Sequence, residues 1–187
     1  MMSKIKLIAI IGPSGSGKDT LLRKVLHHAP SLNRVVNCTT RPKRWGEKEG
    51  IDYFYLTPEQ FAEKLLNGSI IEASSFNDWF YGTEISALNK EKINIGIFNP
   101  EAIESLLLYK DKIDLYIYCL TVKDTIRLIR QLSREKIPDI DEIFRRYKTD
   151  RVDFYDLSFE YTTLKNETKK QLKENIHTII HDIKFMV

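Results

Sequence analysis

The sequence is poor in cysteine and has no long hydrophobic segment. Its two cysteines, Cys38 and Cys119, lie far apart in the 187 residues, which excludes a disulfide framework and gives no support to a cysteine-based zinc site. No apolar run approaches the ~18 residues that a membrane helix needs. The N-terminal residues lead directly into a strand-like run, without the cleavage site of a signal peptide. These absences predict a soluble, cytoplasmic protein with no membrane partner.

A large excess of one charge is also missing, because 29 Lys and Arg residues against 26 Asp and Glu leave a net charge of +3. Two segments are locally basic. Residues 34–50 hold five basic against two acidic residues, and residues 121–151 hold nine against six. Two separate basic segments favour a small anion held from two sides over nucleic acid bound along one continuous face. The alternative is that both segments are ordinary solvated surfaces.

With 42% hydrophobic residues, a chain of this length can bury one sizeable core, so we expect a single domain. Apolar runs of strand length alternate with helical patterns, which predicts an α/β fold around a parallel sheet. Thr57, Pro58 and Gln60 have the spacing of a helix capping box. The expected strands are 5–11, 35–38, 53–56, 70–73, 93–98 and 114–119, and the expected helices are 19–28, 57–67, 100–108, 123–134, 140–152 and one capped by Asn166.

A glycine-rich segment follows the first apolar run. It reads Gly12-Pro13-Ser14-Gly15-Ser16-Gly17-Lys18 and matches G-x-x-x-x-G-K between a buried strand and a helix. In such a loop, backbone N–H groups and the helix N-terminus bind phosphates, and the lysine adds a positive charge. The alternative is a glycine-rich turn with an exposed lysine. The residues expected to bind ATP are Gly12, Pro13, Ser14, Gly15, Ser16, Gly17, Lys18, Asp19 and Thr20.

The position after the lysine departs from the usual pattern. Ser or Thr normally stands there and its hydroxyl binds Mg²⁺, whereas this chain has Asp19, with Thr20 one position later. A carboxylate is also a hard oxygen ligand for Mg²⁺, directly or through water. We therefore expect Mg²⁺ as the cofactor and Asp19 as its candidate ligand.

A second phosphate-binding pattern lies between Thr39 and Tyr53. Arg41 and Arg44 stand three residues apart in a loop, and arginine forks suit the two oxygens of a phosphate monoester. With the glycine-rich loop, this segment resembles the guanylate kinase family, whose pattern is S-x-x-x-R-x-x-R-x-G-E-x-x-G-x-x-Y. The elements around Glu72 and Tyr81 resemble that family too. Trp45 and Trp79, near these motifs, either border the site or pack inside the protein.

The resemblance implies a P-loop NTPase-type three-layer fold with a parallel sheet core, a small acceptor-binding subdomain and a helical lid. The implied regions are a core of 1–34, 93–122 and 155–187, an acceptor-binding region of 35–92 and a lid of about 123–154. It implies phosphoryl transfer from ATP to a nucleoside monophosphate, GMP or dGMP, with Glu72 pairing with guanine. The implied acceptor-binding residues are Asn37, Arg41, Arg44, Tyr53, Glu72, Tyr81 and Thr83, and the implied catalytic residues are Lys18, Arg130, Arg134 and Arg145.

Two of these assignments have a purely structural alternative. Glu72 could be a charged residue on an edge strand, and the lid could be a surface hairpin of two helices. Departures from the family concern the base. Asn37 replaces a serine, and Gly96 and Phe98 replace two acids. Our hypothesis is that Asp19 restores the negative charge lost at Gly96. The alternative functions are a broader deoxynucleoside monophosphate kinase, an enzyme like ribose 1,5-bisphosphate phosphokinase, and a non-catalytic guanylate-kinase-like binding module. The oligomeric state is not predicted.

Overall fold

A five-stranded parallel sheet forms the centre of the protein, seen in a computed structural model that describes residues 4–44, 46–76, 78–134 and 136–186. The strand order is β2-β7-β1-β8-β9, so the long glycine-preceding strand lies in the middle. All four neighbouring pairs are parallel. The strands are β1 (Ile5–Ile11), β2 (Asn33–Arg34), β7 (Asn94–Ile97), β8 (Ile113–Thr121) and β9 (Thr162–Lys165).

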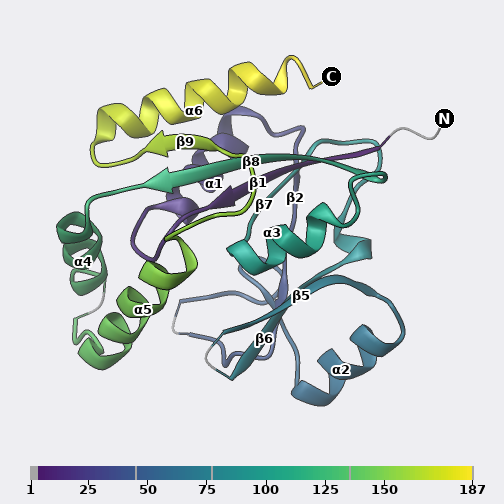
Figure 1. The fold of residues 1–187 in the computed structure, drawn as a ribbon, viewed down its shortest axis with the longest axis horizontal. Helices are drawn as coiled ribbons and strands as arrows, with labels where there is room; N and C mark the ends of the chain where they lie inside the picture. Colours follow the sequence, from purple (N-terminus) through teal and green to yellow (C-terminus); the bar gives the residue numbers. More distant parts are fainter. Residues whose placement is uncertain (1–3, 45, 77, 135, 187) are drawn as a thin grey trace.

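Helices cover both faces of this sheet, which gives three layers (Figure 1). Successive side chains of a strand point to opposite faces. Ile8 and Ile10 of β1 therefore pack with the helices α1 (Lys18–His28) and α6 (Lys169–Ile183). Leu7, Ala9 and Ile11 pack with α3 (Pro100–Leu107) on the other face. The central strand is buried on both sides, which is why its sequence is a continuous apolar run.

A second, smaller sheet lies below the first in Figure 1, with α2 (Pro58–Leu66) beside it. Its order is β4-β3-β6-β5, and β3 pairs in parallel with β4 while the other pairs are antiparallel. Phe61 of α2 packs with Cys38 and Ile70 in a small core. The strands are β3 (Cys38–Thr39), β4 (Phe54–Tyr55), β5 (Ile70–Phe76) and β6 (Trp79–Glu84), and a 3₁₀ turn at Ile85–Ala87 follows.

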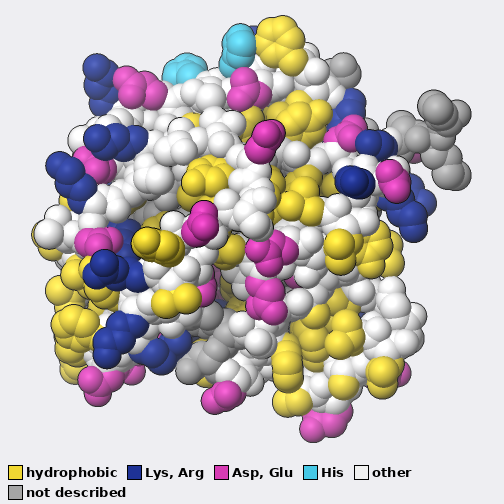
Figure 2. All heavy atoms as spheres, viewed as in Figure 1, with side chains coloured by type: hydrophobic (Ala, Val, Ile, Leu, Met, Phe, Trp, Pro, Cys, Tyr) yellow, Lys and Arg dark blue, Asp and Glu magenta, His cyan; other side chains and the backbone are white. Residues whose placement is uncertain are grey.

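Two antiparallel helices, α4 (Asp124–Leu132) and α5 (Ile140–Asp153), project beside the end of the central sheet (Figure 1). In α4 the basic residue Arg127 is only 2% exposed, whereas Ile129 is 62% exposed. Figure 2 shows Lys and Arg side chains next to hydrophobic ones over these two helices. Part of the basic surface of α4 therefore faces the interior of the protein, toward the glycine-rich loop.

The expected α/β architecture with a parallel sheet core is confirmed, and the capping box at Thr57 is present. Two local expectations differ from the structure. Residues 35–38 are not one strand, because β2 ends before them and β3 begins at their end. Asn166 does not cap the last helix; Thr168 does, in a capping box with Gln171. The strands β6 and β9 were not predicted, and β9 carries mostly exposed side chains.

Cys38 and Cys119 are both buried free thiols, as expected. None of the helices that the structure describes combines the length and apolar character needed to cross a membrane.

Candidate active site

The glycine-rich loop joins the end of β1 to the start of α1, at the carboxyl edge of the parallel strands. The Lys18 ammonium donates to the carbonyl oxygens of Gly12 at 2.6 Å and Pro13 at 3.2 Å, and thus closes the loop on itself. Gly15 has a φ of 78°, and a Cβ there would lie 2.7 Å from the carbonyl oxygen of Arg127. Only glycine allows this approach. Burial lowers the pKa of Lys18, against the opposite effects of Asp19 and Asp150.

Helices α4 and α5 hold this loop from outside. The Asp150 carboxylate accepts from the Ser14 N–H at 2.9 Å and from the Ser14 hydroxyl at 3.3 Å. It also pairs with the buried Arg127 at 2.9 Å. Arg130 donates to the carbonyl oxygens of Gly15 and Ser16, each at 3.3 Å. The glycine-rich loop, which would bind phosphate, is therefore joined to α4 and α5 by hydrogen bonds.

Asn166, from the loop after β9, completes the support. Its side-chain amide donates to the Ser16 carbonyl at 2.7 Å, and its own carbonyl accepts from Arg130 at 2.9 Å. A side chain 150 positions away in sequence thus fixes one peptide of the glycine-rich loop. The first bond is made by the Asn166 side chain and the second by its backbone carbonyl, and a buried side-chain donor bonded in this way is costly to replace.

The loop faces a cavity of about 620 Å³ that runs between the two sheets and the helical pair. The cavity brings together most of the predicted site residues. Of the predicted set, Gly12, Ser14, Gly15, Gly17, Lys18, Asp19, Thr20, Asn37, Arg41, Arg44, Tyr53, Glu72, Tyr81, Arg130 and Arg134 line it. Pro13, Ser16, Thr83 and Arg145 do not, and Trp79 does not either. Trp45 lies outside the described residues.

Two arginines of the β3–β4 loop form the far end of this cavity. Arg41 is 3% exposed, and its guanidinium donates to both oxygens of Glu47 at 2.8 and 3.0 Å. Glu47 also accepts from the Arg44 N–H at 2.8 Å and from the Tyr55 hydroxyl at 2.7 Å. Burial would raise the pKa of Glu47, but these hydrogen bonds, first that of Arg41, lower it to about 2. Glu47 therefore stays ionised, orients the Arg41 guanidinium and holds the backbone of Arg44.

The rest of this end is aromatic. The ring centroids of Tyr53 and Tyr81 lie 6.0 Å apart, and the Arg41 guanidinium lies 5.4 Å from the Tyr53 centroid. Burial raises the pKa of Tyr53 to about 12, so its hydroxyl keeps its proton. Arg44 remains 36% exposed at its side chain. Two guanidinium groups and two phenols thus face one place, an arrangement that suits the oxygens of a phosphate monoester.

Glu72 of β5 supplies a buried carboxylate to the same cavity. Its Oε1 accepts from the Thr83 hydroxyl at 2.5 Å, whereas its buried Oε2 has no hydrogen-bond partner among the described residues. The Thr83 hydroxyl also lies 3.2 Å from the side-chain oxygen of Asn37, whose amide donates to the Ile97 carbonyl at 3.0 Å. Thr83 therefore stands behind Glu72 and orients it. An unpartnered carboxylate oxygen in a cavity calls for a ligand that donates.

The free energy of unfolding should depend on pH because the Glu72 carboxyl is buried in the folded protein. Burial raises the pKa of Glu72 to about 7, and the Thr83 hydrogen bond only partly opposes this. The native state then binds more protons than the unfolded state between pH 4.5 and 7, so stability falls as pH rises through this range. We expect a loss of about 3 kcal/mol in the free energy of unfolding. Urea unfolding at pH 5 and pH 8 measures it.

A matched comparison separates Glu72 from other titrating groups. The Glu72→Gln variant should lose most of this pH dependence, because glutamine does not titrate. Equal pH dependence in both proteins would show that Glu72 ionises normally in the fold.

Gly96 and Phe98, the two departures near the base region, form a packed pair. A Cβ at Gly96 would lie 2.9 Å from the Phe98 ring and 3.1 Å from the Cβ of Val35. An acidic side chain at 96 therefore has no room while Phe98 is present. Phe98 is buried and lines the cavity near Glu72. The two replacements are one structural change, which places an aromatic ring in the cavity wall.

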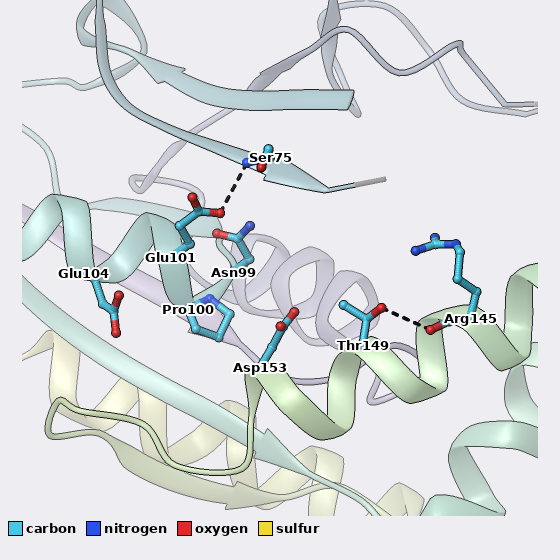
Figure 3. Close-up of a pocket in the computed structure, with 8 residues that line it drawn as sticks. All are labelled: Ser75, Asn99, Pro100, Glu101, Glu104, Arg145, Thr149 and Asp153. Atoms are coloured by element: carbon cyan, nitrogen blue, oxygen red, sulfur yellow. Dashed lines mark hydrogen bonds between the residues drawn. The ribbon is translucent and has the colours of Figure 1, made fainter. Parts of the chain in front are cut away.

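The lid arginines do not all lie where they were expected. Arg134 is exposed and lines the cavity, whereas Arg145 lines a neighbouring pocket of about 360 Å³. Figure 3 shows Arg145 projecting from α5 at one end of that pocket, Glu101 and Glu104 at the other end, and Asp153 between them. The next residue, Arg146, lines the main cavity and is 18% exposed. Glu142 binds both, at 2.7 Å from each Nε.

Sequence reasoning missed four residues that build the site: Arg146, Asp150, Arg127 and Asn166. Arg146 had a signal, because it is also basic and adjacent to the predicted Arg145. Its positive charge lowers the pKa of Arg44, after the larger effect of burial, so the two arginines are electrostatic neighbours. The other three had no local signal, because their contacts join segments far apart in sequence.

Asp19 offers the carboxylate for a metal ion. It is exposed, stands in the first turn of α1 next to Lys18, and lines the cavity. Among the residues described, no three His, Cys, Asp or Glu side chains cluster as a metal cage would require. Mg²⁺ commonly binds through one or two carboxylates together with substrate phosphates and water. The residues present fit that mode of binding.

Comparison with known proteins places this site in a family. The family model described as guanylate kinase matches residues 4–179. A guanylate kinase of Mycoplasma genitalium is 29% identical over 174 residues, which is 90% of this chain and 72% of that protein. A guanylate kinase of Legionella pneumophila (strain Lens) is 42% identical over 92 residues, which is 49% of this chain. The match covers 43% of that protein, less than half of its length.

A solved structure supports the fold. The crystal structure of guanylate kinase from Anaplasma phagocytophilum superimposes with a TM-score of 0.64 at 18% sequence identity, and the match covers 99% of this chain and 88% of that one. At this identity the likeness concerns the fold alone. The family model, by contrast, spans nearly the whole chain, including both phosphate-binding patterns. On that match, the chain belongs to the guanylate kinase family.

Proposed function

We propose that this protein transfers the γ-phosphoryl group of ATP to GMP or dGMP. The observation that carries the proposal is that one cavity holds the glycine-rich loop, the arginine pair of the β3–β4 loop and the unpartnered carboxylate of Glu72. The three features suit a donor triphosphate, an acceptor monophosphate and a base that donates hydrogen bonds. Lys18 and the loop amides bind the donor, and Arg41, Arg44, Tyr53 and Tyr81 bind the acceptor phosphate.

The base is read by Glu72, with Thr83 and Asn37 behind it. Guanine presents N1–H and its 2-amino group side by side, and both donate. A carboxylate accepts from both, whereas adenine has no donor at either place. Thr83 donates to Oε1 of Glu72, which keeps a second lone pair, and Oε2 has no partner among the described residues, so the carboxylate can accept both hydrogen bonds.

The reaction needs no general base in this site. An oxygen of the acceptor phosphate, already anionic at neutral pH, forms a bond to Pγ while the bond from Pγ to the β–γ bridging oxygen breaks, and ADP leaves. Positioning and neutralisation of charge supply the rate enhancement. Arg130, Arg134 and Arg146 contribute positive charge from the helical pair, and Arg145 stays a predicted contributor. Closure of α4 and α5 over the substrates would exclude water.

We assign the core to 1–34, 93–122 and 155–187, the acceptor-binding region to 35–92 and the lid to about 123–154. Mg²⁺ is the proposed cofactor, held by Asp19 together with the nucleotide, and it would neutralise charge on the donor phosphates. A cytoplasmic location stays a prediction, as does the absence of nucleic-acid and membrane partners.

The test is a coupled ADP-release assay with ATP and Mg²⁺ against GMP, dGMP, AMP, dAMP, CMP, UMP, dTMP and ribose bisphosphate. We expect a strong preference for GMP or dGMP. A broad profile over deoxynucleotides would favour the second candidate, a deoxynucleoside monophosphate kinase, which the Phe98 ring in the cavity wall supports. No activity with any acceptor would contradict both proposals and favour a binding module.

Asp19→Ala should raise the Mg²⁺ concentration that gives half-maximal turnover, by about tenfold. The reason is that the variant loses a carboxylate beside the donor phosphates but keeps Lys18. Turnover measured over a range of free Mg²⁺ at fixed ATP tests this. Asp111→Ala, an exposed acid remote from the cavity, is the matched control. Identical Mg²⁺ curves for the Asp19 variant and the control would exclude Asp19 as a ligand.

A further inference from the structure

Gln131 of α4 has a buried side-chain amide that nothing described in the structure satisfies. Its Oε1 and Nε2 are both buried, and neither has a hydrogen-bond partner among the described residues. Most buried side-chain polar atoms in folded proteins have a partner, so each exception needs an explanation. Other unpartnered atoms of this kind, those of Ser16 and Glu72, belong to the glycine-rich loop and the base site. The third such group therefore also points to a ligand.

The position of Gln131 along α4 identifies the part of the cavity that it borders. One turn earlier, Arg127 contacts the Ser14 carbonyl of the glycine-rich loop, and the preceding residue, Arg130, contacts the Gly15 carbonyl. Three residues later, Arg134 lines the same cavity as Gln131. Ile143 of α5 is another lining residue, so the cavity wall continues across the helical pair. Gln131 thus stands between Arg130 and Arg134, lines the same cavity as the glycine-rich loop, and lies on a different element from Glu72.

We propose that the side-chain N–H of Gln131 donates a hydrogen bond to the phosphoryl group being transferred. The inference rests on the proposed function and adds a catalytic residue to it. Ionised phosphate oxygens accept hydrogen bonds and cannot donate them. They are therefore suitable partners for an unused donor in a basic part of the site. An amide adds a directional donor without a further charge. Donors already in place for the transition state are an effective means of catalysis.

The test is Gln131→Met, which keeps the length of the side chain but removes both polar atoms. We expect affinity for the non-hydrolysable ATP analogue AMPPNP to fall about tenfold while affinity for ADP stays within about twofold, because ADP lacks the γ-phosphoryl group. Turnover with GMP should fall about 10- to 100-fold with little change in the KM for GMP. The melting temperature should rise, because an unsatisfied buried amide is removed. Ser133→Ala, at the exposed C-cap of the same helix, is the control.

The outcomes divide clearly. Unchanged turnover and an unchanged ratio of AMPPNP to ADP affinity would overturn the proposal and leave Gln131 as a tolerated polar group. An equal loss of affinity for AMPPNP and ADP would also overturn the proposal, because Gln131 would then contact a part of the nucleotide that both contain. A lower melting temperature would show that the amide is satisfied within the protein. If the unaltered protein phosphorylates no acceptor, the proposed function fails, but the affinity ratio still decides the role of Gln131.

Discussion

Replacing Lys18 by methionine should lower the turnover number by about three orders of magnitude, the largest effect expected of any single change. Lys18 is the cation closest to the glycine-rich loop, and in the structure its ammonium is held by the Gly12 and Pro13 carbonyls. In the working enzyme it would exchange these partners for donor phosphate oxygens. Methionine fills similar space but leaves the developing charge without its counterion.

The control is Lys24→Met, an exposed lysine further along α1. Steady-state turnover, together with AMPPNP binding, separates loss of chemistry from loss of binding. Because burial lowers the pKa of Lys18, its ammonium is costly to bury, and the methionine variant should remain folded. A Lys18→Met protein with turnover within threefold of the original would remove Lys18 from the mechanism.

Replacing Glu72 by glutamine should lower kcat/KM for GMP by about two orders of magnitude and leave the KM for ATP unchanged. The carboxylate is 4% exposed and one of its oxygens has no partner among the described residues, so in the proposed function it accepts hydrogen bonds from the base. Glutamine keeps the shape but presents an N–H group where a second acceptor is needed. Two hydrogen bonds to a charged group are lost or opposed, and each contributes about 1.5–3 kcal/mol.

The comparison of acceptors sharpens this test. AMP should be used equally poorly by both proteins or slightly better by the variant, because adenine offers no donor to a carboxylate. Glu63→Gln on α2, exposed and remote from the cavity, controls for loss of a negative charge. If Glu72→Gln left the ratio of GMP to AMP turnover as it was, base selection would have to come from elsewhere, and Phe98 would be the first residue to change.

The parts of the site that are continuous in sequence were predictable. The glycine-rich loop needs a strand, six loop residues and a helix in immediate succession, and this local order is visible as a pattern. The loop with Arg41 and Arg44 is also one short segment. Thr168 and Gln171 repeat the spacing of the capping box at Thr57, so the sequence also carries a signal for the start of the last helix, two residues after the expected cap at Asn166.

The adjacent arginines show where such reasoning stops. Arg145 and Arg146 carry the same charge on consecutive positions of a helix, where side chains point about 100° apart. Which one enters the cavity depends on how α5 packs against the rest, and the structure places Arg146 there. Similarly, the pairing of Gly96 with Phe98 is explained only by the packing, because a Cβ at position 96 would lie 2.9 Å from the Phe98 ring.

The sequence by itself determined the class of fold, the two candidate phosphate-binding loops and the chemistry that they suit, because these depend on local periodicity and on residues close together in the chain. The tertiary structure alone decided which polar groups are buried, which are left without partners and which distant residues support the loops. Asp150, Asn166 and Gln131 lie more than 110 positions after the glycine-rich loop, and two of them bond to it directly. Burial and hydrogen bonding between distant residues depend on the packed structure, so no local sequence pattern predicts them.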